Sequence, residues 1–198
     1  MNVKEEILKI LPKPTNQTKV AHIITASKAE DDVSYVEKDK KLMEEAGFQI
    51  NNIDIAGKTE TDLRKILEGF NVVYVQGGNT FYLLKSIKES GFNTIIKELI
   101  ENGVVYIGVS AGSIIAGPTI ETATWKGIDK NKFGVTDFTG LNFVPFNIFV
   151  HYTEQYRELL IEESKKSSYP IRILTDDQAF LVQNGGATLV GKGVEVKL

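Results

Sequence analysis

The sequence of 198 residues contains no cysteine. That absence excludes disulfide bonds, thiolate metal sites and a cysteine nucleophile. Only two histidines are present, His22 and His151, so an imidazole base has two candidates. No apolar run approaches the ~20 residues of a membrane-spanning helix. The N-terminal stretch MNVKEEILKILPKP is too charged for a signal peptide. We therefore expect a cytoplasmic protein with no membrane partner.

An excess of positive charge is also missing. The formal net charge is −3, which argues against nucleic acid as a partner because backbone binding needs a basic face. Hydrophobic residues make up 42% and charged residues 25%, as in ordinary globular proteins. The length suits one domain with a substantial core. We therefore expect residues 1–198 to form a single α/β domain.

Apolar segments rich in β-branched residues alternate with amphipathic helical segments over the first two-thirds of the chain. This alternation predicts βαβ units, and continuously apolar strands indicate a sheet covered on both faces. We expect a doubly wound, mainly parallel sheet with helices on both faces, followed by a helix and a small β-hairpin region. The expected strands are 20–27, 48–55, 71–79 and 103–110, the late helix is 153–166, and three short strands follow, ending with VEVKL (194–198).

Helix start signals fall between these strands. Ser34-x-x-Glu37 and Thr59-x-x-Asp62 have the spacing of capping boxes, and Thr80 is expected to cap the helix after the third strand. An Asn-Gly-Gly turn at 184–186 predicts the hairpin.

The segment GVSAG, residues 108–112, has the pattern G-x-S-x-G between a predicted strand and a predicted helix. This is the setting of a nucleophile elbow, in which a serine stands on a tight turn. The first helical amides, that of Ala111 above all, would point at an oxyanion forming at Ser110. The alternative is a tightly packed strand-to-helix turn without chemistry.

A second glycine turn, Gln76-Gly77-Gly78-Asn79, ends the preceding strand. Ligands of open α/β sheets bind beyond the carboxyl ends of the strands, so both glycine turns should share one edge. An amide from residues 77–78 could then be a second oxyanion donor. A plain turn before a helix is the competing interpretation.

A serine nucleophile needs a base and an acid that orients the base. His22 lies inside a buried strand, where a histidine is usually a packed core residue. His151 stands at the junction of two elements and is the favoured base. Four aspartates are candidates for the acid, and spacing alone does not choose among them: Asp129, Asp137, Asp176 and Asp177.

The blocks GGNTFYLL (77–84), YIGVSAGSIIAGPTI (106–120) and VHY (150–152) resemble the peptidase E family of serine peptidases, which are aspartyl dipeptidases related to cyanophycinase. The resemblance covers most of residues 20–190. It implies a flavodoxin-like fold akin to class I glutamine amidotransferases, and no metal or cofactor. By position it implies Ser110 as nucleophile, His151 as base, and Gly78 and Ala111 as oxyanion donors.

The acid departs from the family pattern. The aspartyl dipeptidases have an aspartate just beyond the PTI segment, where this chain reads ETATWKG and places Trp125. Other members are described with a glutamate in an acidic pair after a later strand, and Asp176-Asp177 resembles that pair. The resemblance therefore favours Asp177 as the acid, with the other three aspartates as alternatives.

A residue expected to affect substrate specificity also departs from the family pattern. The dipeptidases carry PTIRT, whereas this chain carries PTIET with Glu121, which disfavours an N-terminal aspartate in the substrate. Asn79, Glu121 and Trp125 are the expected substrate-binding residues. The alternatives are an exposed loop carboxylate for Glu121 and loop packing for Trp125.

These observations predict a serine exopeptidase that hydrolyses short, dipeptide-like substrates through an acyl-enzyme. A free-terminus substrate fits a small domain whose sequence shows no sign of a long groove. Short peptides are the expected partners, and the chain is compatible with a homodimer. The alternatives are a non-catalytic ligand-binding protein that kept the elbow, and an ester or amide hydrolase with the same residues.

Overall fold

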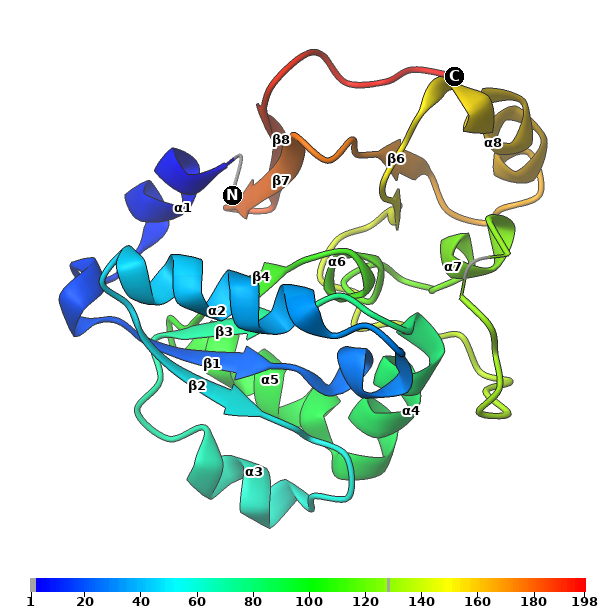
Figure 1. Cartoon of the computed structure of the whole chain (residues 1–198). Coiled ribbons are helices and arrows are strands. Elements are labelled where there is room, and N and C mark those ends of the chain that lie inside the picture. The colour runs from blue at the N-terminus through cyan, green and yellow to red at the C-terminus, as the bar shows by residue number, and fades with distance from the viewer. Residues whose placement is uncertain (1–2, 128) are drawn as a thin grey trace.

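Four strands form a parallel sheet at the centre of the chain, in the spatial order β2-β1-β3-β4 (Figure 1). The computed structural model describes residues 3–127 and 129–198. The strands are β1 (Lys19–Ile23), β2 (Gln49–Ile53), β3 (Val72–Val75) and β4 (Val105–Gly108). Each neighbouring pair is parallel, so the carboxyl ends of the strands share one edge. This confirms the expected parallel sheet and puts both glycine turns at that edge.

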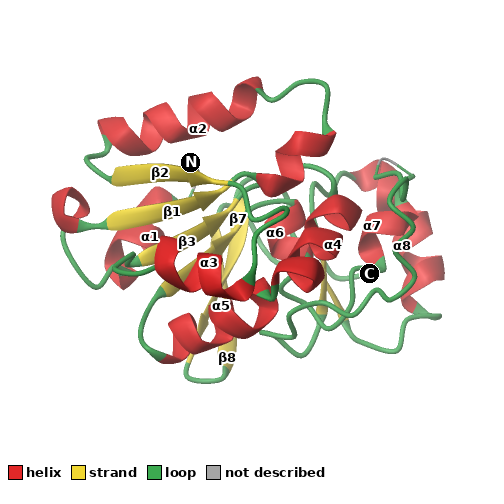
Figure 2. Ribbon diagram, turned by 90° about the horizontal axis from the view of Figure 1, so that it is seen from below, coloured by secondary structure: helices red, strands yellow, loops and turns green. Residues whose placement is uncertain are grey.

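Helices cover both faces of the sheet (Figure 2). α2 covers one face, and α3 and α5 cover the other, which confirms the doubly wound arrangement. The helices are α1 (Lys4–Ile10), α2 (Ser34–Glu45), α3 (Glu60–Ile66), α4 (Thr80–Ser90), α5 (Phe92–Glu101), α6 (Ala111–Ile114), α7 (Thr122–Trp125) and α8 (Arg157–Ser164), with 3-10 turns η1 (Thr15–Gln17), η2 (Thr25–Ala29) and η3 (Glu154–Tyr156).

The side chains of β3 divide between the two faces because successive residues of a strand point in opposite directions. Val73 and Val75 belong to the larger hydrophobic cluster, together with residues of α3 and α5. Val72 and Tyr74 pack with Met43 of α2 in a second cluster. Burial on both faces explains why the strand reads as a continuous apolar run.

Two small sheets follow the central one in the last third of the chain. β5 (Asn147–Phe149) and β6 (Ile171–Ile173) are parallel, while β7 (Gln178–Gln183) and β8 (Gly186–Gly191) form an antiparallel hairpin. Asn184 and Gly185 have φ of 51° and 76°, the positive values that a tight hairpin turn requires. The predicted hairpin is thus confirmed. Residues 194–198, expected as a strand, do not form one.

The helix starts agree with the sequence in part. The capping box of Thr59 and Asp62 is present, with both reciprocal hydrogen bonds. The box predicted at Ser34 is wrong, because Ser34 is the first helical residue and donates its N–H to Asp32 instead. Asn79, one residue before the expected Thr80, caps α4 by accepting the N–H of Tyr82.

None of the helices in the described ranges is long and apolar enough to cross a membrane. Even α2, with 12 residues, falls short of the ~20 that a bilayer requires.

Candidate active site

The two glycines of the GVSAG segment are fixed by the close approach of backbone to backbone. A Cβ at Gly108 would lie 2.2 Å from the carbonyl oxygen of Gly112. A Cβ at Gly112 would lie 2.2 Å from the carbonyl oxygen of Val75 in β3. Tyr106 braces the same turn by donating its hydroxyl to Gly112 O at 2.6 Å. The turn is therefore wedged against β3 with no room for side chains at either glycine.

Ser110 occupies a strained backbone conformation at the top of this turn. Its φ is 52° and its ψ is −110°, a combination that L-residues rarely adopt. Such outliers cost about 1–3 kcal/mol and concentrate at functional sites. Ser110 stands between the end of β4 and the start of α6, as the elbow pattern predicts. Ser113, one turn on, donates its hydroxyl to Gly108 O at 2.7 Å.

The second glycine turn lies directly against the serine. A Cβ at Gly77 would be 2.9 Å from the Cβ of Ser110. The N–H of Gly77 donates to the side-chain oxygen of Gln76, whose amide nitrogen donates to Asp39 at 2.8 Å. Gly78 has φ of 133°, and a Cβ there would lie 2.4 Å from the backbone of Ala26. The turn therefore requires glycine at both positions.

Two backbone amides beside Ser110 have no acceptor within residues 3–127 and 129–198: those of Gly78 and Ala111. The amides that follow them in the chain are engaged, since Asn79 N donates to Ala26 O and Gly112 N donates to Val109 O. The residues expected as oxyanion donors thus offer the N–H groups that such a role needs.

His151 lies within hydrogen-bond distance of Ser110. Its Nε2 is 2.9 Å from Ser110 Oγ, and its Nδ1 is 2.5 Å from Asp176 Oδ1. The His151 side chain is 53% exposed and that of Asp176 is 75% exposed, so water reaches both side chains. The resemblance favours Asp177 as the acid, whereas this contact lies at Asp176, the residue before it.

The pairing of β5 with β6 brings the imidazole and the carboxylate together. His151 follows β5 and Asp176 follows β6, and the two strands are parallel, so both residues leave at the same end. Hydrogen bonds from Leu174 N to Phe149 O and from Tyr152 N to Leu174 O continue the pairing past the strands. β5 and β6 form a small sheet that is separate from the central one.

Lys126 holds the backbone next to the imidazole, and sequence reasoning missed it. Its ammonium donates to the carbonyls of Val150, at 2.5 Å, and His151, at 3.1 Å, and lies over the rings of Phe149 and Tyr156. Burial lowers the pKa of Lys126 to about 8, against the opposing field of Asp176. His151 has φ of 55°, a strained value that these bonds help to maintain. The only sequence signal was a lysine in the loop after Trp125.

The other two aspartates serve the helix framework. Asp129 accepts the N–H of Thr80 at 3.0 Å, at the first turn of α4. Asp137 accepts from Lys88 and from Thr139, and the Lys88 ammonium holds the pKa of its carboxyl well below the usual range. Neither carboxylate is bonded to His151 in the described part of the chain.

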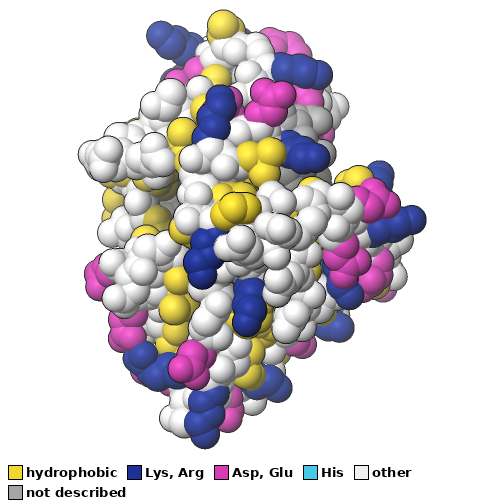
Figure 3. Space-filling model, turned by 90° about the vertical axis from the view of Figure 1, so that its left-hand side faces the viewer, with side chains coloured by type: hydrophobic (Ala, Val, Ile, Leu, Met, Phe, Trp, Pro, Cys, Tyr) yellow, Lys and Arg dark blue, Asp and Glu magenta, His cyan; other side chains and the backbone are white. Residues whose placement is uncertain are grey.

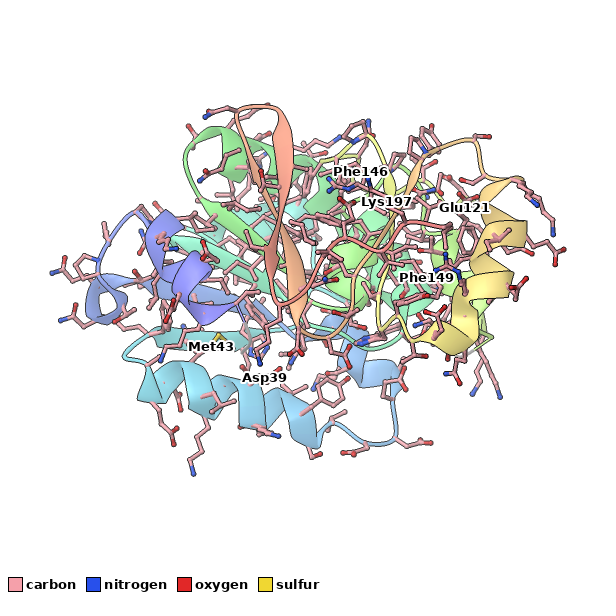
Figure 4. All side chains as sticks on the ribbon, turned by 90° about the horizontal axis from the view of Figure 1, so that it is seen from above. Asp39, Met43, Glu121, Phe146, Phe149 and Lys197 are labelled. Carbon is pink, nitrogen blue, oxygen red and sulfur yellow. The ribbon has the colours of Figure 1, made fainter. Side chains whose placement is uncertain are left out.

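The three expected substrate-binding residues are engaged in structural contacts. Asn79 caps α4 and donates to Lys130 O. The carboxylate of Glu121 accepts from Asn147 and from Ser167, close to α8 in Figure 4. Trp125 stacks on Phe149 with ring centroids 6.3 Å apart, in a cluster with Leu160 of α8. These contacts agree with the alternative interpretation of Trp125 as a residue that packs the loop.

His22 is a core residue, as its strand position predicts. It is fully buried, and its Nδ1 is 2.9 Å from Asn52 Oδ1. Burial lowers the pKa of this imidazole. Its ring meets Tyr74 edge-on, with centroids 5.2 Å apart. His22 is therefore not a candidate for the base at Ser110.

A groove of about 750 Å³ extends from Ser110 and His151 along β4 to α1, with β7 on its other side. No long groove was expected from the sequence. The apolar residues of β4 and β7 that line it have the pattern of ordinary strands. Asn79, Glu121 and Trp125 are not among the described residues that line this groove.

The profile of the family described as Peptidase family S51 matches residues 1–190 of the chain. Among individual relatives, an uncharacterized peptidase of Listeria monocytogenes is 35% identical over 158 residues, which is 77% of this chain and 77% of the relative. An uncharacterized peptidase of Pasteurella multocida is 30% identical over 83% of this chain and 81% of its own length. A peptidase E of Shigella flexneri is 31% identical over 79% of this chain and 69% of that protein.

A solved structure shares the fold over nearly the whole length. The crystal structure of a peptidase E candidate from Listeria monocytogenes superposes with a TM-score of 0.84 at 28% identity, covering 97% of this chain and 94% of the other. It supports the α/β architecture with its parallel sheet and C-terminal hairpin.

Proposed function

Because the chain belongs to peptidase family S51, the peptidase E family of serine peptidases, we propose that it hydrolyses short peptides through an acyl-enzyme on Ser110. The observation that carries this proposal is the continuous contact from Ser110 Oγ through His151 to Asp176. A carboxylate oxygen can only accept a hydrogen bond, so Nδ1 of His151 carries the proton. Nε2 is then free to accept the hydroxyl proton of Ser110, as a general base requires.

The first half-reaction breaks the peptide bond. Ser110 Oγ attacks the scissile carbonyl carbon while its proton passes to His151 Nε2. The negative charge that forms on the carbonyl oxygen is held by the N–H groups of Gly78 and Ala111. Asp176 stabilises the imidazolium without itself taking the proton. His151 then protonates the leaving nitrogen, and the amine departs.

The second half-reaction regenerates the enzyme. A water molecule loses a proton to His151 Nε2 and attacks the ester carbon, and the same two amides hold the second oxyanion. Collapse releases the carboxylic acid and returns the proton to Ser110 Oγ. The exposure of the His151 and Asp176 side chains leaves this water a path to the ester. Cleavage from a free end, as in a dipeptidase, is part of the proposal.

The experiment that tests the proposal is covalent labelling with a fluorophosphonate, followed by hydrolysis of a dipeptide library. Wild type should label and hydrolyse, and Ser110→Ala should do neither. Ser113→Ala is the matched control, because Ser113 lies one turn away and bonds to Gly108 O; it should still label. Folding of each variant is checked by circular dichroism. A folded wild type that resists labelling would contradict the proposal and favour a non-catalytic binding protein.

A further inference from the structure

The groove beside Ser110 is open between two strands that do not pair with each other. β4 is the outer strand of the central sheet, and β7 belongs to the separate hairpin. The two strands run in opposite directions along the groove: β4 ends at the serine, whereas β7 begins just after Asp176. The space between them starts at the reacting groups and ends at α1.

The outer edge of β4 offers backbone groups for strand pairing. Val105 N donates to Asn71 O and Val109 N donates to Val75 O, so these residues face β3. In a parallel ladder every second residue turns its N–H and C=O to the other side. The amides of Tyr106 and Gly108 therefore face the groove, within a few residues of Ser110. An extended peptide could bond to them as an added strand.

One side of the hairpin supplies apolar side chains to the groove. Phe180 and Leu189 pack on the main core, as alternate residues of the two strands. Their neighbours Ala179, Leu181 and Val190 point to the opposite face and belong to no core cluster of the described residues. Phe180 and these three residues all line the groove. The molecular face that carries α1 displays apolar side chains interspersed with charged ones (Figure 3).

The charges at the groove have one sign. Glu6, Asp39 and Asp176 line it, and no lysine or arginine does so within residues 3–127 and 129–198. Asp39 projects from α2 toward the sheet in Figure 4. The ammonium of Lys126 near the imidazole is occupied by two carbonyls. A substrate with carboxylate side chains would meet repulsion here without a counter-charge.

We propose that this groove binds the substrate as an extended, apolar peptide segment that adds a strand to the edge of β4 and presents its scissile carbonyl to Ser110. The proposal rests on the peptidase function and specifies its substrate class. The groove has a volume of about 750 Å³, which lies within the range typical of ligand sites. β4 has four residues, so a paired segment of about four residues, some 13 Å long, matches it.

Binding is measured by isothermal titration calorimetry on full-length Ser110→Ala, which cannot turn over its ligand. The probe is a pentapeptide amide that alternates valine with threonine, and the comparison peptide has glutamate in place of the valines. We expect the apolar peptide to bind at least tenfold more tightly, with a negative heat-capacity change from apolar burial. Equal affinity for the two peptides would overturn the proposal.

Strand addition makes a periodic prediction. When each amide of the apolar probe is N-methylated in turn, every second position should weaken binding by about tenfold and the intervening ones should not, because alternate amides face β4. A loss without this alternation would overturn pairing with the strand edge.

A charge exchange tests the location. In the Ser110→Ala background, Leu181→Arg should weaken the apolar peptide and tighten the glutamate peptide, each by about tenfold. Val194→Arg is the matched control; Val194 is 84% exposed and does not line the groove, so neither affinity should change. Because one affinity is expected to rise, loss of folding cannot imitate the result. If Leu181→Arg and Val194→Arg had the same affinities for the two peptides, the placement of the peptide in this groove would be overturned.

The outcomes separate this proposal from the peptidase function. If Ser110→Ala binds neither peptide while wild type labels with a fluorophosphonate and hydrolyses dipeptides, the groove proposal fails and the function stands. If wild type resists labelling but the peptides bind with the alternating pattern, the function fails and the groove is a peptide-binding site.

Discussion

The two halves of the site are built in different ways. The serine half consists of two glycine turns at the edge of the four-stranded sheet, wedged together so closely that a Cβ at Gly77, Gly108 or Gly112 would clash. The imidazole half consists of His151 and Asp176 on loops after two strands of three residues each, with more than half of each side chain exposed. Rigidity in the first half comes from backbone contacts, and in the second from side chains that hold loops.

This difference decides how each half should respond to substitution. A change at the glycines displaces backbone, so it should damage geometry and stability together. A change at the carboxylate or the lysine beside the imidazole should alter catalysis while the fold persists, because those side chains are exposed or lie at the rim of the core.

The largest effect is expected in the imidazole half. Asp176→Asn removes the carboxylate that contacts His151 Nδ1 and should lower kcat by up to about 10⁴-fold, because the wrong tautomer is then favoured. Asp177→Asn is the matched control and should lose less than about tenfold. Steady-state hydrolysis of one dipeptide by the three proteins measures this. A larger loss in Asp177→Asn would return the acid to the residue that the family resemblance favoured.

The serine half is tested at Gly78. Gly78→Ala forces a Cβ to within 2.4 Å of the Ala26 backbone and should displace one oxyanion donor. Loss of one donor lowers kcat by about 10²–10³-fold. Gly69→Ala controls for the backbone cost, because Gly69 also has positive φ but open space around it, so stability should fall slightly and kcat should not. A folded Gly78→Ala with wild-type kcat would remove Gly78 from the oxyanion site.

A smaller effect is expected at Lys126, which supports the imidazole half. Lys126→Met keeps the apolar stem but removes the bonds to the carbonyls of Val150 and His151, and should lower kcat/KM by about tenfold. Because the pKa of Lys126 is about 8, wild-type kcat/KM should also decline above pH 8 as the ammonium loses its proton.

The pH profile separates positioning from packing. Lys126→Arg stays charged and should retain activity without that alkaline decline. The same decline in Lys126→Met would assign it to another group and leave Lys126 with packing alone.

The smallest effect lies in the core, away from both halves. Burial lowers the pKa of His22, so between that value and ~6.5 the unfolded chain binds more protons than the folded one. Stability from neutral His22 is therefore complete above pH ~6.5 and falls on acidification, by at most about 1.4 kcal/mol per pH unit. Urea unfolding at pH 7.5 and 5.5 should show a smaller loss in His22→Leu than in wild type. Equal losses would contradict a depressed pKa.

Much of the fold follows from local sequence. The alternation of apolar strands with helices predicts the parallel sheet, because strands joined by helices run in the same direction. Asn184-Gly185 predicts the hairpin, because a tight turn depends on adjacent residues. The strand limits are less well predicted: the 3-10 turn Thr25–Ala29 overlaps the end of the strand expected at 20–27. Thr25 there donates its hydroxyl to Asp54, a contact between distant segments that the apolar pattern does not contain.

The amino-acid sequence predicts the candidate nucleophile Ser110, its glycine-lined turn and the facing glycine pair. These features can be predicted because a position with no room for a side chain requires glycine. Three features become visible only in the folded chain. They are the contact of Asp176 with His151, the carbonyls that Lys126 binds, and the groove between β4 and β7. The physical reason is that these features depend on the register of β5 against β6 and on strand edges left unpaired, and pairing between distant segments leaves no local pattern.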